Sequence, residues 1–317
     1  MITRLKRKLQ QLIASQIDPF RDEVFAQVDG LKFSMGQLHA SVQRSLSIHR
    51  LQDAEFKVFS QNGEDGIIQH LISHVPITNK SFIEIGVQNY CEANTRFLMM
   101  SNNWQGMIVD ADENHVRFLE ESGLRWRHRI VPITAFVTRE NVNSLIEAAG
   151  YKGDVGLLSV DIDGMDYWVL QAVKVVSPRI LVVEYNSRFG NHRAVTVPYD
   201  DRFNRTKAHY SNCYFGASLA AFCMFAEERG YAFVGSGSSG VNAFFVRRDV
   251  LPESIRPLTI QEGFTNARLQ ESRNPDGTLA YLTNAAEREL MGDLPVVDLA
   301  SNQTVALKSI FEIGGAL

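Results

Sequence analysis

The chain has 317 residues, of which 45% are hydrophobic and 21% charged, so it can fold around a substantial core. Its formal net charge of −4 excludes the strongly basic character typical of nucleic-acid binding, and we expect small or neutral partners instead. Three cysteines without a CxxC pair are too few for a disulfide framework, which favours a reducing compartment. Because no stretch approaches about 18 apolar residues and no signal-peptide pattern is found, we expect a cytoplasmic protein.

Residues 1–55 are predicted to be helical and to precede the main domain. Their apolar residues recur mostly three or four positions apart, the spacing with which a helix buries a narrow seam: Ile17, Phe20, Val24, Val28, Leu31, Met35, Leu38, Val42 and Leu46. The strict repeat covers only about two heptads, and Pro19 and Asp29-Gly30 interrupt it. An oligomerising coiled coil, a helical hairpin and a pair of helices packed on their own domain all fit. A homo-oligomer through these helices is the predicted assembly.

The first turns of this region combine basic and apolar residues. Within residues 1–14, the basic side chains are Arg4, Lys6, Arg7 and Lys8, and the apolar ones include Ile2, Leu5, Leu9, Leu12 and Ile13. Such a stretch can make a weak peripheral contact with a membrane, although the same pattern is typical of a solvated helix face.

From residue 56 the pattern changes to alternating strands and helices, which predicts βαβ units and a parallel sheet. Parallel strands are expected at 81–87, 105–111, 129–137, 155–163 and 179–186, and residues 231–249 are expected to form an antiparallel hairpin. Five parallel strands that close with a hairpin resemble the Rossmann-like, seven-stranded α/β sheet of class I methyltransferases, with helices on both faces. We therefore predict this domain at 56–250, followed by an appendage at 251–317.

Ligands of open parallel sheets bind beyond the carboxyl ends of the strands, so polar residues there are candidates for a cofactor site. The loop after the first strand contains Glu84, Gly86 and Asn89, with glycine allowing close approach to the backbone. Asp110 ends the second strand, where a carboxylate can accept both hydroxyls of an adenosine ribose. Ala135 follows the third strand and is expected to line the adenine.

Several motifs occur in a fixed order: FSQNGEDGII (59–68), FIEIGVQN (82–89), NTRFL (94–98), WQGMIVDAD (104–112), VDIDGMDYWVL (160–170) and PRILVVEYN (178–186). Together they resemble the FkbM-type methyltransferases of bacterial glycan biosynthesis. The resemblance implies S-adenosylmethionine as cofactor, with its methionine end near Gln61, Glu64, Asn94 and Thr95. The chain departs from the family at 161–164, where Asp-Ile-Asp-Gly replaces the common Asp-x-Glu-Gly.

Acidic and amide groups at the ends of the fourth and fifth strands predict a divalent-metal site. Asp161 and Asp163 are expected on the same side of one strand, and Glu184 and Asn186 end the next. These oxygen ligands suit Mg²⁺. A bound metal would lower the pKa of an acceptor hydroxyl. The layout is similar to that of the catechol and macrolide-sugar O-methyltransferases, which makes Asp161 a catalytic candidate.

Without a metal, a base would have to act alone. His192 and His209 lie in the long loop after the fifth strand, and a neutral histidine can accept a hydroxyl proton. In the same loop, Tyr199, Asp200 and Phe203 offer a ring face and a carboxylate to a carbohydrate.

The resemblance and these residues predict an O-methyltransferase that acts on a sugar hydroxyl, in a free sugar, in a nucleotide-sugar or within a growing surface glycan. A non-catalytic scaffold of a glycan-synthesis complex remains an alternative, because the helical amino terminus could assemble one. A nucleotide-sugar oxidoreductase is disfavoured, since the chain lacks GxGxxG and the sheet closes with a hairpin.

Overall fold

The computed structural model describes residues 2–121 and 123–312. Within these residues a seven-stranded sheet has the order β3-β2-β1-β4-β5-β8-β7. The strands are β1 (Ser81–Ile85), β2 (Gln105–Asp110), β3 (Ile130–Thr134), β4 (Gly153–Val160), β5 (Val176–Glu184), β7 (Tyr231–Ser236) and β8 (Asn242–Arg247). The first five pair in parallel, and β8 joins β5 and β7 antiparallel. This confirms the predicted parallel sheet with a closing hairpin.

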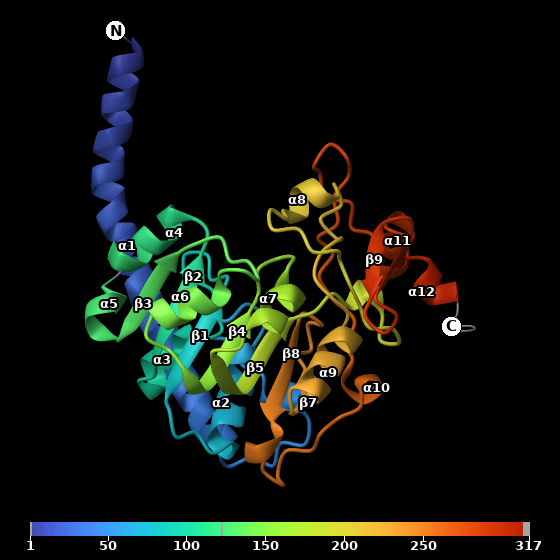
Figure 1. Cartoon of the computed structure of the whole chain (residues 1–317). Helices are drawn as coiled ribbons and strands as arrows, with labels where there is room; N and C mark the ends of the chain where they lie inside the picture. Colours follow the sequence, from blue (N-terminus) through green and yellow to red (C-terminus); the bar gives the residue numbers. More distant parts are fainter. Residues whose placement is uncertain (1, 122, 313–317) are drawn as a thin grey trace.

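Helices cover both faces of the sheet (Figure 1). They are α2 (Glu64–His74), α3 (Arg96–Asn102), α4 (Glu113–Glu121), α5 (Leu124–Arg127), α6 (Val142–Ala148), α7 (Asp166–Ala172) and α9 (Leu219–Glu228). Because side chains of a strand alternate between its two faces, Ile83 of β1 joins the core under α6, α7 and α9, whereas Phe82 joins the core under α2 and α3. Burial on both faces explains the nearly continuous apolar runs of these strands.

The segment before α2 is fixed by one buried acid. The Asp65 carboxylate accepts the backbone N–H groups of residues 58–60 at 2.7–2.8 Å. Burial nonetheless raises the pKa of Asp65 to about 6. Gly66 lets α2 approach η1 (Leu51–Ala54), since a Cβ there would lie 2.1 Å from the carbonyl oxygen of Ala54. These contacts place Gln61 at the carboxyl edge of the sheet.

The amino-terminal region forms one continuous helix, α1 (Ile2–Gln43). It runs through Pro19 and Gly30, so the predicted alternatives of a helical hairpin or a pair of helices are wrong. Figure 1 shows its last turns against the domain and its first turns projecting away. The predicted membrane contact of residues 1–14 depends on side chains that are not among those the structure describes.

The loop after β5 and the carboxyl-terminal region build a second, smaller layer. In the described residues β6 (Val195–Thr196), β9 (Pro295–Asp298) and β10 (Gln303–Ala306) form a separate sheet in the order β10-β9-β6. The short helices of this layer and its approaches are η2 (Ser187–Phe189), α8 (Arg205–Ala208), η3 (Arg248–Val250), α10 (Ile260–Gly263), α11 (Asn284–Leu290) and α12 (Ser309–Glu312). Among the helices described, none is both long and apolar enough to cross a membrane.

Candidate functional site

A cavity of about 240 Å³ opens at the carboxyl ends of β1, β2 and β4. The residues predicted for the site that line it are Gln61, Glu84, Gly86, Asn94, Asp110, Ala135, Asp161, Asp163, Tyr199, Asp200 and Phe203. The chain therefore brings segments more than a hundred residues apart to one edge of the sheet, where ligands of such folds bind.

Gly86 joins the loop after β1 to the loop after β4. Its backbone has a φ of +87°, and a Cβ at this position would lie 1.6 Å from the carbonyl oxygen of Asp161. Its N–H donates to the carbonyl oxygen of Val109 at 2.9 Å. Only glycine combines a positive φ with so close an approach to Asp161. The absence of a Cβ keeps the floor of the cavity open, and a ligand can lie close to the backbone.

Glu84 holds the start of the next helical segment. Its carboxylate accepts the backbone N–H groups of Asn94 (2.7 Å) and Thr95 (3.1 Å), and the Thr95 hydroxyl also donates to it. Burial raises the pKa of Glu84 to about 7, although these hydrogen bonds oppose the shift. The side chain is therefore a structural part of the cavity wall.

Asp110 is also bound by the protein itself. Oδ2 accepts the N–H of Gln88 at 2.7 Å, and Oδ1 lies 2.9 Å from both the N–H of Asp112 and Nδ1 of His115. A carboxylate has about four acceptor positions, and the described residues use three of them. Asp110 keeps an acceptor position on Oδ2 for a hydroxyl, and the bidentate contact with a ribose stays a prediction.

Three residues predicted to contact the cofactor do not line the cavity. Glu64 is buried and accepts the N–H of Asn62 (2.8 Å) and Nδ2 of Asn242 (2.9 Å). Thr95 is fully buried against Glu84, and Asn89 accepts the N–H of Cys91 at 3.0 Å. Each side chain instead fixes the backbone or a neighbour that forms the wall.

A smaller cavity of about 110 Å³ adjoins the first and shares Gln61, Gln88, Asp161 and Asp163 with it. Glu184, at the end of β5, lines this second space. Carboxylate oxygens of Asp161, Asp166 and Glu184 lie within 4.8 Å of one another. The buried Oε2 of Glu184 has no hydrogen-bond partner among the described residues.

The crowding of these acids changes their protonation. Burial, followed by the charges of neighbouring acids, raises the pKa of Asp161 and of Glu184 well above the usual values. Two such carboxyl groups cannot both ionise easily at close range. The pair therefore favours either a retained proton or a positively charged ligand.

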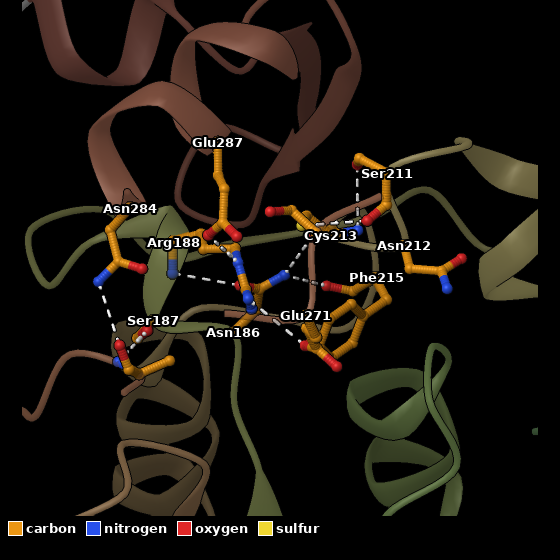
Figure 2. Close-up of polar contacts among 12 residues, drawn as sticks. Asn186, Ser187, Arg188, Ser211, Asn212, Cys213, Phe215, Glu271, Asn284 and Glu287 are labelled. Carbon is orange, nitrogen blue, oxygen red and sulfur yellow. Dashed lines mark hydrogen bonds and ion pairs between the residues drawn. The ribbon is translucent and has the colours of Figure 1, made fainter. Parts of the chain in front are cut away.

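The predicted four-residue metal site does not form. β4 ends at Val160, and Asp163 adopts a φ of +55° and forms an ion pair with Arg205 at 2.6 Å, so it does not alternate with Asp161 along a strand. The amide of Asn186 donates to the carbonyl oxygens of Cys213 and Phe215, each at 2.9 Å, and accepts the N–H of Arg188 (Figure 2).

Asp166 joins the acid cluster in space but is occupied there. Its oxygens accept the N–H groups of Ile162 (2.7 Å) and Gly164 (2.9 Å), in the loop just before α7. Asp161 and Glu184 are thus the two carboxylates of the cluster best placed to bind a ligand.

Arg205 and Glu271 were not predicted from the sequence. Arg205 of α8 pairs with Glu271 as well as Asp163, and its guanidinium lies 3.8 Å from the centre of the Phe215 ring. Arg188 links the same region to α11 through a buried ion pair with Glu287 at 2.6 Å (Figure 2). No motif spacing connects residues 66 positions apart, as Arg205 and Glu271 are, so only tertiary structure reveals this wall.

The predicted histidine bases lie elsewhere. His192 lines a different cavity, beside Arg193 and Asp298. Nδ1 of His209 lies 2.8 Å from the hydroxyl of Ser211. Among the described residues that line the two joined cavities there is no histidine, which corrects both assignments.

The three predicted acceptor contacts do reach the cavity, on its side facing the loop after β5. Tyr199 donates to Glu140, and the guanidinium of Arg139 lies 3.8 Å from the centre of its ring. Phe203 packs on Gly164, where a Cβ would lie 2.3 Å from the ring. The loop thus places aromatic faces beside the cavity.

No family model matches the sequence, and no curated protein matches it. Among solved structures, an S-adenosylmethionine-dependent methyltransferase from Clostridium acetobutylicum shares 10% identity at a TM-score of 0.37, with 58% of this chain and 89% of that chain covered. An O-methyltransferase from Bacillus cereus, in complex with SAH, shares 14% identity at a TM-score of 0.38, with 68% and 88% covered. Likenesses this distant assign no activity, and membership of the FkbM-type family remains a prediction.

Proposed function

We propose that this protein is an S-adenosylmethionine-dependent O-methyltransferase acting on a sugar hydroxyl. The observation that supports this most directly is the joining of two cavities at Asp161. One cavity extends to the ends of β1, β2 and β3, and the other to the acid pair at the ends of β4 and β5. A donor and an acceptor can therefore meet at one carboxylate, as group transfer requires.

The first cavity, which we call the cofactor half, fits an adenosine joined to an amino acid. Asp110 keeps one acceptor position for a ribose hydroxyl, and Gly86 allows a ligand to approach the backbone. At the other end the buried Oδ1 of Asn242 has no partner among the described residues, so it can accept from an ammonium group. When bound, S-adenosylmethionine would supply a methyl group on a positively charged sulfur.

The second cavity, which we call the acceptor half, supplies the proton acceptor. An ionised carboxylate of the Asp161–Glu184 pair takes the proton of the acceptor hydroxyl. At the same time, the hydroxyl oxygen forms a bond to the methyl carbon. Transfer from the bound donor would break its carbon–sulfur bond and leave a neutral thioether. General-base assistance of this kind contributes on the order of 100- to 10,000-fold in rate.

A divalent cation is a further part of this proposal. Mg²⁺ is commonly bound by one or two carboxylates together with water. Asp161 and Glu184 fit that description, because Oε2 of Glu184 has no partner among the described residues and a cation would offset the charge of Asp161 that raises the pKa of Glu184. The ion would lower the pKa of the acceptor hydroxyl.

A sugar acceptor is proposed because ring faces and carboxylates surround the opening. Tyr199 and Phe203 offer apolar surfaces, while Asp200 and the acid pair accept hydroxyl hydrogens.

Isothermal titration with S-adenosylmethionine tests the cofactor. We expect saturable binding, and the absence of heat at millimolar ligand would overturn the proposal. Transfer of a labelled methyl group to a panel of sugars and nucleotide-sugars, with small phenols as the comparison set, tests the acceptor. Exclusive labelling of phenols would contradict a sugar substrate while leaving methyl transfer intact.

The metal has its own test. Activity is measured after exhaustive dialysis against EDTA and again after Mg²⁺ is restored. We expect loss and recovery, together with calorimetric Mg²⁺ binding that the double variant Asp161→Asn and Glu184→Gln abolishes. Full activity in EDTA would exclude the metal and leave the carboxylate pair as the base.

A further inference from the structure

The carboxyl-terminal half of α1 has one face fixed to its own domain. Gln43 donates to the carbonyl oxygens of Ala54 and Gly66 at 2.7 and 2.9 Å, and Asp29 pairs with Arg96 at 2.6 Å. Between them, a Cβ on Gly36 would lie 2.4 Å from Val58. This face is therefore closely packed, and α1 cannot rotate without breaking these contacts.

A second face of the same helix carries apolar side chains that the domain leaves exposed. They are Phe20 (69% exposed), Val24 (41%), Val28 (42%), Leu31 (67%), Met35 (61%), Leu38 (64%), Val42 (49%) and, in the turn after the helix, Leu46 (59%). We call these eight residues the α1 stripe. Exposed apolar residues are common singly, but a continuous row of this length indicates an interaction surface.

The geometry of the helix keeps the two faces apart. At about 100° per residue, the α1 stripe falls within a sector about 80° wide, centred about 140° from the face that packs on the domain. The domain therefore cannot cover both faces. The α1 stripe is therefore open to another molecule.

The charges of the segment argue against a lipid surface as that molecule. Residues 20–46 contain three basic side chains (Arg21, Lys32 and Arg44) and three acidic ones (Asp22, Glu23 and Asp29). Helices that lie on membranes usually have a polar face rich in lysine and arginine. The segment that carries the stripe is therefore balanced and lacks that attraction to anionic lipid, because the basic cluster of α1, Arg4 to Lys8, comes before it in the sequence.

A second copy of the helix fits the α1 stripe better. Its apolar residues are spaced by three or four positions, so two copies can interdigitate along the same seam. Leu38, Val42 and Leu46 also border a groove of about 210 Å³ against η1, into which a partner's side chain can insert. No charged residue lies within the α1 stripe, so self-pairing buries no like charges.

We propose that the protein is a homodimer in which the α1 stripes of two copies pack against each other. The stripe is long enough, because its helical part, residues 20–43, spans about 35 Å. If each of the eight side chains buries on the order of 100 Å², each copy contributes about 800 Å², the size of a standard stable interface.

Sedimentation velocity of the full chain at micromolar concentration tests the dimer. Wild-type protein is expected at twice the 35.6 kDa of one chain. The variant Leu31→Glu with Leu38→Glu places two charges within the α1 stripe and is expected to sediment as a monomer. As a matched control, Ala26→Glu with Gln37→Glu adds the same charges at exposed positions off the stripe and is expected to stay dimeric.

Circular dichroism and S-adenosylmethionine binding establish that the variants are folded. Should Leu31→Glu with Leu38→Glu fail to fold, Val24→Glu with Val28→Glu replaces it, in a part of α1 that precedes the contacts with the domain. A monomeric wild type, or a stripe variant that remains dimeric, would overturn the proposal. So would flotation of monomeric wild type with vesicles of anionic phospholipid, which would identify lipid as the occupant.

Discussion

At the ends of β1 and β2, the carboxylates of Glu84 and Asp110 are surrounded by hydrogen-bond donors, whereas at the ends of β4 and β5 those of Asp161 and Glu184 face each other. Glu84 accepts two backbone N–H groups and a hydroxyl, and Asp110 two backbone N–H groups and a histidine nitrogen. Glu184 has one oxygen without any partner among the described residues.

The difference shows how the same residue type serves two purposes in one site. A buried carboxylate with backbone donors fixes the shape of a loop, because losing those donors would cost about 1–3 kcal/mol for each group left unpaired. A buried carboxylate without donors is costly to the fold and is available to a ligand. The acids of the first cavity are therefore held by backbone donors, whereas the second cavity keeps a carboxylate oxygen available to a ligand.

The largest effect is expected from Gly86→Ala, because this residue joins the two halves. Its Cβ would overlap the carbonyl oxygen of Asp161, 1.6 Å away, at a φ of +87° that alanine avoids. We expect a loss of stability of about 3 kcal/mol or more and no detectable cofactor binding. Urea unfolding and calorimetry measure the two effects.

The control is Gly150→Ala, at a position that also has a positive φ (+85°) but where an added Cβ would have nothing within 4 Å. Equal losses in both variants would show that backbone strain alone is responsible.

Asp161→Asn should affect turnover more than stability. The variant removes the proposed base and the repulsion with Glu184, so we expect a fall in kcat on the order of 100- to 10,000-fold with an unchanged or higher Tm. Burial and neighbouring acids raise the pKa of Asp161, so wild-type activity should increase with pH as the group loses its proton. A variant that keeps the wild-type kcat and pH profile would exclude Asp161 as the base.

Glu84→Gln should change the pH dependence of stability. Because burial raises the pKa of Glu84 from 4.5 to about 7, its contribution to stability is complete below pH 4.5 and is lost as the pH rises through 7. The variant cannot ionise, so its free energy of unfolding should fall less steeply across that range, by at most about 1.4 kcal/mol per pH unit. Urea titrations at a series of pH values measure the slope. Identical slopes would mean that Glu84 is ionised in the folded protein.

Tyr199→Phe is expected to have the smallest effect. The hydroxyl donates to Glu140, whose side chain is exposed, so its loss should cost less than about 1 kcal/mol, while the ring face remains. We expect kcat/KM for the sugar to fall less than about fivefold, whereas Tyr199→Ala should lower it further. If both variants lose the same activity, the hydroxyl and not the ring contacts the acceptor.

The sequence predicted the sheet and the edge at which the cavity opens, because strands that alternate with helices are typical of a parallel sheet and polar residues mark where each strand ends. The sequence could not predict which acidic side chains accept hydrogen bonds from the backbone, because those bonds depend on the conformation of the loops. Asp163 was expected beside Asp161 in a strand, but the strand ends one residue before Asp161. The ion pair between Arg205 and Glu271 was not predicted, because the two residues are far apart in the sequence and come together only in the folded protein.

The α1 region shows a different reason for an incomplete prediction. Pro19 and Gly30 suggested breaks, yet the helix continues through both. Compared with alanine, a glycine inside a helix costs about 1 kcal/mol and an internal proline about 3 kcal/mol. The contacts between the last turns of α1 and the domain can offset this cost near Gly30. The apolar spacing was visible in the sequence, but which face the domain leaves exposed was not.

The wall around the acid pair also has a consequence for how such a protein can diverge. Glu271 and Glu287, which hold Arg205 and Arg188, belong to residues 251–317, outside the sheet that carries Gly86 and Asp110. Replacements in this terminal segment can reshape the entrance without disturbing the donor pocket. Changes in residues 251–317 can therefore alter which ligands enter the second cavity while the residues that line the first stay the same.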